Sequence, residues 1–249
     1  TRLFDRQGSR ISLTESGNLL LEHCERILED YKRLEYEMHL LHNEYTGGLK
    51  LGASTTIAQY VLPPLLASFI GKFPQVSLSL LNGNSREIEA ALQEHRIDLG
   101  FVEGVFRLPN IRYTTFLEDE LVAVVRTGSK LAVGEEITPD ELFHLPLVLR
   151  ERGSGTLDVF ERALQQHNIK LSSLQVLMYL GSTESIKLFL EHTDCLGIVS
   201  VRSITRELYS GQLRVVEIKG MPMLRDFSFA QPQGRKRFGA SIHAICHAQ

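Results

Sequence analysis

Apolar positions along the chain change their spacing near the glycine pair Gly47-Gly48. Before this pair, apolar side chains recur at alternating intervals of four and three residues, with no Pro or Gly between Asn18 and Thr46. The stripe consists of Leu20, Cys24, Ile27, Tyr31, Leu34, Met38, Leu41 and Tyr45. Such a pattern over three heptads is typical of a coiled-coil seam and predicts a dimerising helix over residues 17–46. A long helix packed on its own domain is the alternative.

After the glycine pair, short apolar runs alternate with helical stretches. The predicted strands cover residues 49–53, 76–81, 97–102, 120–126, 147–149, 176–180, 195–200, 213–218 and 227–230. The predicted helices cover residues 57–73, 85–95, 156–167, 184–191 and 235–247. Strands that alternate with helices of these lengths indicate βαβ units and a parallel sheet covered on both faces. Two such sets in succession predict two α/β lobes.

Composition and charge narrow the class of protein. The 249 residues are 43% hydrophobic and 23% charged, which is ordinary for a globular protein. A net charge of −3 disfavours sequence-independent nucleic-acid binding by the whole chain. No apolar run reaches the roughly 18 residues of a membrane span, so no membrane partner is expected. Cys24, Cys195 and Cys246 are odd in number and far apart, which favours a reducing cytoplasmic location.

The first seventeen residues combine basic side chains with a turn. Leu3-Phe4-Asp5-Arg6 is followed by a short turn and then by R-I-S-L-T-E-S-G, which ends at Gly17. Thr14 is a good N-cap, and Glu15 falls in the first turn, where the helix dipole favours negative charge.

This N-terminal stretch resembles the wing of the winged helix-turn-helix in LysR-type transcriptional regulators, whose pattern is L-F-x-R, a short turn and R-x-x-x-L-T-x-x-G. Later motifs are similar to the effector domain of the same regulators: K-L-G-A-S-T-T, L-P-P-L-L-x-x-F, F-P-Q-V, R-I-D-L-G-F-V and C-L-G-I-V-S. The resemblance implies an α/β effector domain that is folded like a periplasmic binding protein, with two lobes joined by two crossing strands.

The resemblance also implies a division of the chain. The expected parts are a wing remnant (1–16), a dimerising linker helix (17–46) and an effector-binding domain (47–249), with lobe one at 47–122 plus 227–249 and lobe two at 123–226. The helix that reads DNA bases is expected upstream of this chain. Arg2, Arg6 and Arg10 are therefore expected to contact the phosphates of double-stranded DNA in the intact protein only. A homodimer or homotetramer is expected, because effector domains of this family also pair.

Four predicted strand-to-helix junctions carry small hydroxyl or amide residues. Ligands of open α/β sheets bind outside the carboxyl ends of the strands, and helix N-termini there suit anions. The candidates are Ser54, Thr55, Thr56, Asn84, Ser85, Ser154, Gly155, Thr156, Ser182 and Thr183, with Arg150 and Arg152 as charged anchors. They predict a small polar or anionic effector between the lobes. The alternatives are simple helix caps for the hydroxyls and a solvated pair for the arginines.

No motif indicates catalysis, a metal or a cofactor. The chain lacks a P-loop, a three-glycine dinucleotide fingerprint and a G-x-S-x-G elbow. His39 and His42 have no third ligand at an obvious spacing. Glu118-Asp119-Glu120 is interpreted as a solvated charge run.

The sequence therefore predicts a cytoplasmic, effector-responsive, DNA-binding regulator of LysR type that is not an enzyme. A stand-alone small-molecule binding protein of the same fold is the first alternative, and the wing-like N-terminus argues against it. An α/β enzyme is the second, and measured turnover would indicate it.

Overall fold

A computed structural model describes the chain except for residues 8–9, 42–46, 106, 132–133 and 234–249. For residues 6–7, 10–11, 29, 32–33, 35–41 and 47 it describes the backbone only. Two compact units divide the chain: residues 1–49 with 72–77, and residues 50–71 with 78–249. The predicted closing helix at 235–247 lies outside the described residues.

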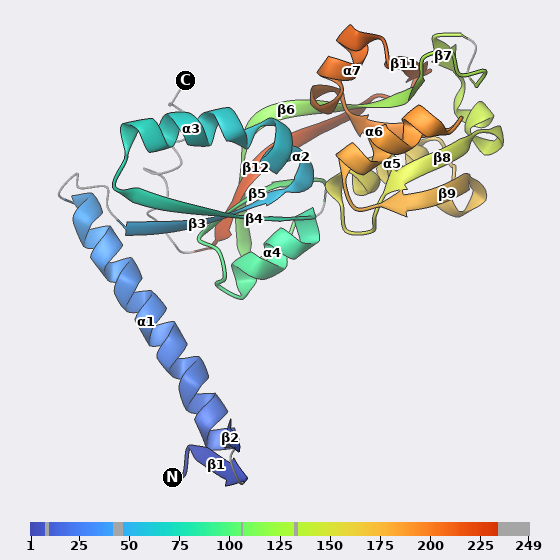
Figure 1. The fold of residues 1–249 in the computed structure, drawn as a ribbon. Helices are drawn as coiled ribbons and strands as arrows, with labels where there is room; N and C mark the ends of the chain where they lie inside the picture. Colours follow the sequence, from blue (N-terminus) through green and yellow to red (C-terminus); the bar gives the residue numbers. More distant parts are fainter. Residues whose placement is uncertain (8–9, 42–46, 106, 132–133, 234–249) are drawn as a thin grey trace. The chain divides into compact units, whose positions relative to one another are not determined.

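The first unit begins with a two-stranded antiparallel hairpin, β1 (Phe4–Gln7) and β2 (Arg10–Leu13). Thr14 caps the helix that follows, as predicted, because its Oγ1 accepts a hydrogen bond of 3.0 Å from the Gly17 N–H. A Cβ at position 17 would lie 2.1 Å from the Leu3 carbonyl oxygen, so only glycine fits there. The hairpin is therefore held against the first turn of the helix (Figure 1).

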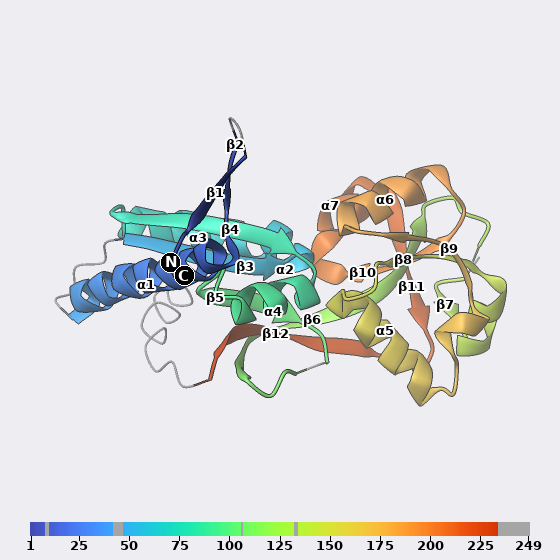
Figure 2. The same cartoon turned by 90° about the horizontal axis from the view of Figure 1, so that it is seen from below.

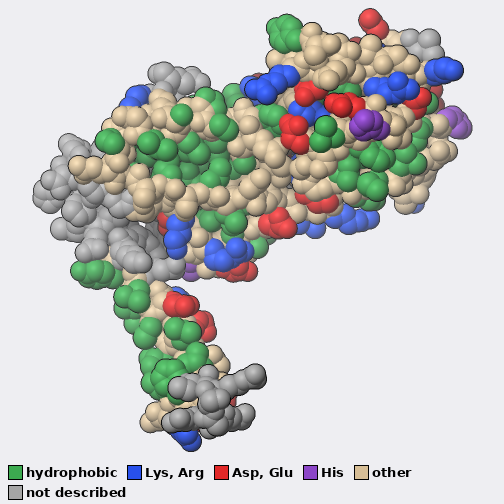
Figure 3. Space-filling model, viewed as in Figure 1, with side chains coloured by type: hydrophobic (Ala, Val, Ile, Leu, Met, Phe, Trp, Pro, Cys, Tyr) green, Lys and Arg blue, Asp and Glu red, His purple; other side chains and the backbone are tan. Residues whose placement is uncertain are grey.

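Helix α1 (Glu15–Leu41) carries an exposed apolar stripe along its described part, and Figure 3 shows it as hydrophobic surface. Between 46% and 65% of each side chain is exposed at Leu19, Leu20, Leu21, Ile27, Leu28, Tyr31 and Leu34. Cys24 is exposed as well. The side chains of Met38 and Leu41, and Tyr45 as a whole, lie outside the described residues. The helix is thus confirmed, and its pairing with a second subunit stays a prediction.

One mixed sheet runs through the second unit, in the strand order β4-β3-β5-β12-β6-β10-β8-β9, with β11 paired to β6 and β7 paired to β11. The strands are β3 (Gly47–Ser54), β4 (Val76–Gly83), β5 (Leu99–Glu103), β6 (Ile111–Arg126), β7 (Glu136–Ile137), β8 (Pro146–Arg150), β9 (Gln175–Leu180), β10 (Leu196–Ser200), β11 (Leu213–Ile218) and β12 (Met223–Pro232). We call β3 to β5 and their helices lobe one, and β7 to β11 and their helices lobe two.

Two long antiparallel strands, β6 and β12, join the lobes. They pair from Ile111 with Pro232 to Leu121 with Met223, with one register shift between Phe227 and Ser228. β12 also pairs with β5 of lobe one, and β6 pairs with β10 and β11 of lobe two. The polar pattern of the first half of β6 hid this half from sequence analysis, which predicted only residues 120–126.

The helices of the second unit follow the strands closely. They are α2 (Thr55–Tyr60), α3 (Leu62–Lys72), α4 (Ser85–Gln93), α5 (Gly155–Gln166), α6 (Thr183–His192) and α7 (Thr205–Ser210), with 3-10 turns η1 (Pro139–His144), η2 (Leu171–Ser173) and η3 (Val201–Ser203). The prediction of one helix over 57–73 is wrong, because this stretch forms α2 and α3. Pro63 has no N–H, and its ring would clash with the Gln59 carbonyl in a continuous helix.

Both faces of the sheet in lobe two are apolar, and each is covered by a helix (Figure 2). Leu147 and Leu149 of β8 share one core cluster with Phe160 of α5, whereas Val148 shares another with Ile186 of α6. Successive side chains of a strand point to opposite faces, so one apolar run supplies both clusters. Among the described helices none is long and apolar enough to cross a membrane.

Candidate functional site

Three of the four strand-to-helix junctions singled out in the sequence line one cavity, and Glu151, which follows β8 just before the fourth junction, lines it too. In lobe one, β3 and β4 end there, and in lobe two β8 and β9 do. The cavity has a volume of about 270 Å³ and is lined by Thr55, Gln59, Asn82, Gly83, Asn84, Glu87, Glu151, Gly181 and Ser182. Ligands of open α/β sheets bind outside the carboxyl ends of the strands, so this cavity is the candidate site, and ligand binding there stays a prediction.

Two glycines allow the lobes to approach closely beside this cavity. The Arg86 N–H of lobe one donates a hydrogen bond of 3.3 Å to the Gly153 carbonyl, and Gly153 has a φ of +91° that favours glycine. A Cβ at position 155 would lie 2.3 Å from the Glu103 carbonyl oxygen. Gly155 was a candidate for the effector site, and in the structure it lies against the backbone of lobe one.

Arg150 lies at the end of β8, and its side chain is only 1% exposed. Its Nη2 donates to Thr55 Oγ1 of lobe one at 3.3 Å and to the Gly181 carbonyl at 3.3 Å. Its Nη1 donates to Thr183 Oγ1 at 3.5 Å. The guanidinium therefore contacts hydroxyl groups from both lobes next to the cavity.

Glu151 neutralises this buried cation. Its Oε2 accepts from Arg150 Nε at 2.8 Å, and its Oε1 accepts from Arg150 Nη2 at 3.0 Å. A buried guanidinium without a counter-charge would be strongly destabilising, so a carboxylate partner is expected.

Three buried charged residues that the sequence analysis missed, on β5 and the crossing strands β6 and β12, form a second network. Arg225 of β12 donates from Nε to Asp119 Oδ2 at 2.7 Å and from Nη1 to Thr156 Oγ1 at 3.0 Å. Its Nη1 also lies 3.5 Å from Glu103 Oε1. Ser54 donates to the Glu103 carboxylate. The hydroxyls of Ser54 and Thr156 are thus engaged by this network.

The interpretation of Glu118-Asp119-Glu120 as a solvated charge run is wrong for its central residue. Asp119 is buried, and besides Arg225 it accepts a hydrogen bond of 2.7 Å from Ser200 Oγ. Alternate side chains of a strand face opposite sides, so within β6 Asp119 points inward and its two neighbours remain exposed. A longer prediction for β6 would have revealed this alternation.

Three of the predicted residues cap helices. Asn84 accepts from the Glu87 N–H at 3.0 Å and Ser154 from the Leu157 N–H at 3.2 Å. Ser182 caps α6 in the same way. Asn84 and Ser182 also line the cavity, so capping and contact with a ligand are compatible there.

The other two hydroxyl candidates are buried. Ser85 donates to the Glu103 carbonyl at 2.8 Å. Thr56 Oγ1 has no hydrogen-bond partner among the described residues.

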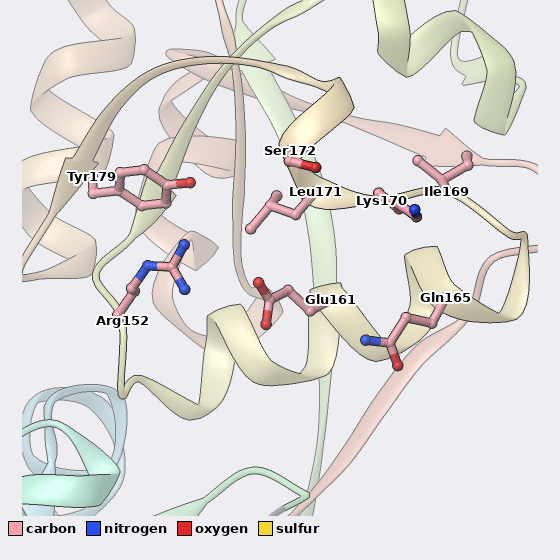
Figure 4. A pocket seen from close by; sticks show the side chains of 8 residues that line it. All are labelled: Arg152, Glu161, Gln165, Ile169, Lys170, Leu171, Ser172 and Tyr179. Atoms are coloured by element: carbon pink, nitrogen blue, oxygen red, sulfur yellow. The ribbon is translucent and has the colours of Figure 1, made fainter.

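Arg152 lies apart from the other candidates. It lines a different cavity of about 340 Å³ within lobe two, whose other polar side chains come from Glu161, Gln165, Lys170, Ser172 and Tyr179 (Figure 4). The structure therefore does not bring Arg152 together with Arg150, and its role as an anchor stays a prediction.

A second cluster of polar and charged side chains, on α2, α6 and α7, connects the lobes. Tyr60, the last residue of α2, donates its hydroxyl hydrogen to Glu184 of α6. Lys187 Nζ lies 2.7 Å from Glu184 Oε1 and 2.8 Å from Glu207 Oε1. Burial, and then Glu184, raises the pKa of Tyr60. Burial also acts to raise the pKa of Glu184, but the hydrogen bonds from Lys187 and Tyr60 outweigh it and lower that pKa.

At the N-terminus the structure describes one of the three predicted DNA-contacting side chains. Arg2 is exposed, donates from Nε to the Phe4 carbonyl at 3.0 Å and lies 3.6 Å from Asp5. The side chains of Arg6 and Arg10 lie outside the described residues, as do those of His39 and His42. Among the described residues, no cluster of three or more His, Cys, Asp or Glu side chains could hold a metal ion.

Comparison with known proteins identifies the family. Residues 42–241 match the model of the LysR substrate binding domain. The chain belongs to the LysR family of transcriptional regulators. The family predicted from the sequence is thereby confirmed.

This LysR-type chain is similar to curated regulators over most of its length. It is 35% identical over 217 residues to the uncharacterized HTH-type transcriptional regulator YeiE of Escherichia coli K12, which covers 87% of the chain and 71% of YeiE. It is 30% identical over 234 residues to the RuBisCO operon transcriptional regulator of Acidithiobacillus ferrooxidans, which covers 94% of the chain and 74% of that protein. These relatives are transcriptional regulators rather than enzymes.

A solved structure supports the fold of this LysR-type chain. The regulatory domain of CcmR from Synechocystis PCC6803, in complex with 2-PG, has a TM-score of 0.69 and 28% identity. The match covers 77% of the chain and 90% of the CcmR domain. It confirms the predicted α/β, periplasmic-binding-protein-like fold of the effector-binding domain.

Proposed function

We propose that this LysR-type regulator senses a small polar or anionic molecule in the cavity between its two lobes. The observation that carries the proposal is the position of Arg150. A buried guanidinium next to the cavity contacts Thr55 of lobe one and Thr183 of lobe two. A ligand that bound this group would contact both lobes, so its binding would favour one relative arrangement of the lobes over others.

The lining of the cavity supports a small polar ligand over a large apolar one. Its side chains carry hydroxyl, amide and carboxylate groups, and its volume of about 270 Å³ is below the range typical of drug-sized ligands. Arginine recognises carboxylates and phosphates with two parallel hydrogen bonds. The complex of the similar CcmR domain with 2-PG supports a small effector for this chain as well.

For the intact protein we propose a cytoplasmic regulator that binds double-stranded DNA as a homodimer or homotetramer, with no enzymatic activity and no cofactor. The helix-turn-helix named in its relative YeiE supports DNA binding, and the exposed stripe of α1 supports self-association. We assign residues 1–16 to a wing, 17–46 to the linker helix and 47–249 to the effector domain, with lobe one at 47–122 plus 227–249 and lobe two at 123–226. The crossing strands β6 and β12 support the division into lobes.

The proposal is tested by thermal unfolding of the chain with a panel of small carboxylic acids, phosphate esters, sulfate and phosphate. A ligand that binds only the folded state raises the unfolding midpoint. Thr55→Ala should weaken binding of the active compound about tenfold, because a lost hydrogen bond to a charged or polar ligand typically costs about 1–2 kcal/mol. Arg150→Gln should abolish binding, while Arg206→Gln on exposed α7 should leave it unchanged. The proposal would be wrong if no compound raised the midpoint, or if Thr55→Ala and Arg150→Gln both bound the active compound like the parent.

A further inference from the structure

The place that an anionic effector would take on Arg150 is already held by a carboxylate of the chain itself. Glu151 binds the guanidinium through both of its oxygens, at 2.8 Å to Nε and 3.0 Å to Nη2. Among the described residues, the other hydrogen-bond partners of Arg150 are neutral, namely two threonine hydroxyls and the Gly181 carbonyl. Among the described residues Glu151 is thus the counter-ion of this cation.

A molecule in the cavity meets the side chain of Glu151 and not that of Arg150. Glu151 lines the cavity and its side chain is 26% exposed, whereas Arg150 is 1% exposed and does not line it. Among the described residues of the lining, the other charged one is Glu87, whose carboxylate accepts the Asn84 N–H at 2.8 Å in the cap of α4. The cavity therefore presents carboxylates to an incoming molecule, while its cation is covered.

We infer that Glu151 is an internal counter-ion that an anionic effector must displace from Arg150, and that Glu151 thereby sets the affinity and selectivity of the cleft for anions. This inference rests on the proposed function and specifies the ligand class as small oxyanions: carboxylates, sulfate or phosphate. Such groups match the guanidinium fork in the way the Glu151 carboxylate does. Partial exposure of Glu151 gives its carboxylate a path into solvent when it is displaced.

Displacement of Glu151 would also make the cleft select anions over neutral molecules. A neutral sugar or alcohol cannot replace the charge that Glu151 supplies, so its binding would leave a buried cation uncompensated. An oxyanion restores this charge and releases Glu151 to water. The competition lowers the affinity for every anion by the same factor, which raises the concentration at which the regulator responds.

The test is calorimetric titration of sodium sulfate and of sodium phosphate into the parent, Glu151→Gln and Glu161→Gln, at constant ionic strength. Glutamine keeps the shape of Glu151 without its charge. Sulfate or phosphate should therefore bind Glu151→Gln at least about tenfold more tightly than the parent, because the anion no longer has to break charge-assisted hydrogen bonds, each of which typically corresponds to a factor of about ten or more in affinity. Glu161 carries the same charge change but lines the other cavity of lobe two, so Glu161→Gln should bind like the parent. Without added anion, Glu151→Gln should unfold at a lower temperature, and sulfate should raise its midpoint more than that of the parent.

The outcomes separate this inference from the proposed function. If the parent bound an oxyanion and Arg150→Gln lost it, but Glu151→Gln bound no more tightly, the counter-ion role would be refuted while anion sensing stood. If Glu151→Gln bound neither sulfate nor phosphate, the counter-ion role would again be refuted, and the compound panel would decide the proposed function separately. Should Glu151→Gln fail to fold, Glu151→Asp replaces it. Its shorter carboxylate reaches the guanidinium less well, so it should bind sulfate more tightly than the parent, and equal affinity would refute the role.

Discussion

Asp158 and Glu89 lie close to the contact between the lobes and are buried with little charge compensation. Asp158, on α5, is 8% exposed, and Arg86 Nη2 lies 4.0 Å from its Oδ1. Burial raises the pKa of Asp158, and Arg86 offsets only part of this effect. Burial also raises the pKa of Glu89, although the Tyr113 hydroxyl donates to it at 2.5 Å. Folding therefore favours the protonated form of each carboxyl group more than water does.

This leads to a prediction for the pH dependence of stability. Because the pKa of Asp158 is higher in the folded than in the unfolded state, its contribution to stability is fully present below the unfolded pKa. It is lost as the pH rises through the folded pKa. Asp158→Asn should therefore raise the free energy of unfolding at pH 7, and the gain should shrink as the pH falls towards the ordinary Asp pKa near 4. Urea unfolding at several pH values measures this, and a gain that did not depend on pH would contradict it.

At the scale of elements, the break between α2 and α3 determines where lobe one meets α6. Pro63 ends α2 early, so Tyr60 falls at the helix terminus and its hydroxyl reaches Glu184. Lys187 lies 5.3 Å from the centre of the Tyr60 ring and holds Glu184 from the other side. This cluster supplies a side-chain contact between the lobes that is separate from that of Arg150.

Removing the Tyr60 hydroxyl should weaken this contact without creating a cavity in the core. Tyr60→Phe keeps the ring over Lys187 and should lower the free energy of unfolding by about 1 kcal/mol, the value of a hydrogen bond that is partly exposed. Urea titration provides the measurement. Tyr209→Phe is the matched control, because Tyr209 on α7 is 90% exposed. Equal stability of the two variants would show that the contact of the Tyr60 hydroxyl with Glu184 does not stabilise the fold.

At the scale of the whole molecule, the exposed stripe of α1 is the strongest indication of self-association. Apolar side chains at spacings of four and three remain exposed along a helix with charged residues on its other faces. Burying each of them in a partner would contribute roughly 1.5–3 kcal/mol. A second subunit offering the same stripe would complete a coiled-coil seam.

Replacing Ile27 and Leu34 by Asp should therefore weaken self-association at least about a hundredfold, since two apolar contacts are lost from each subunit. Sedimentation velocity over a range of concentrations measures the association constant. Leu224→Asp is the control, because it replaces an exposed leucine in the second unit rather than on α1. A parent chain that remained monomeric at tens of micromolar, roughly, would rule out the coiled-coil interpretation.

The sequence by itself determined the family, most of the strands and helices, the long N-terminal helix and the three junctions that line the cavity. These features depend on local patterns, namely periodicity, helix caps and glycine at turns, which a chain carries wherever its segments lie. Thr14 is such a case, because its cap involves residues three positions away.

Only the tertiary structure decided which polar groups of the site face one another. Glu103, Asp119 and Arg225 come from three different strands, so their buried network depends on the register of β5, β6 and β12. Arg150 and Arg152 are two positions apart and looked equivalent, yet β8 ends between them and the chain turns through the positive φ of Gly153. Arg150 is therefore buried against lobe one, whereas Arg152 lies in the other cavity of lobe two. Side-chain direction at the end of a strand depends on the turn that follows and on what packs against it, and the sequence pattern encodes neither.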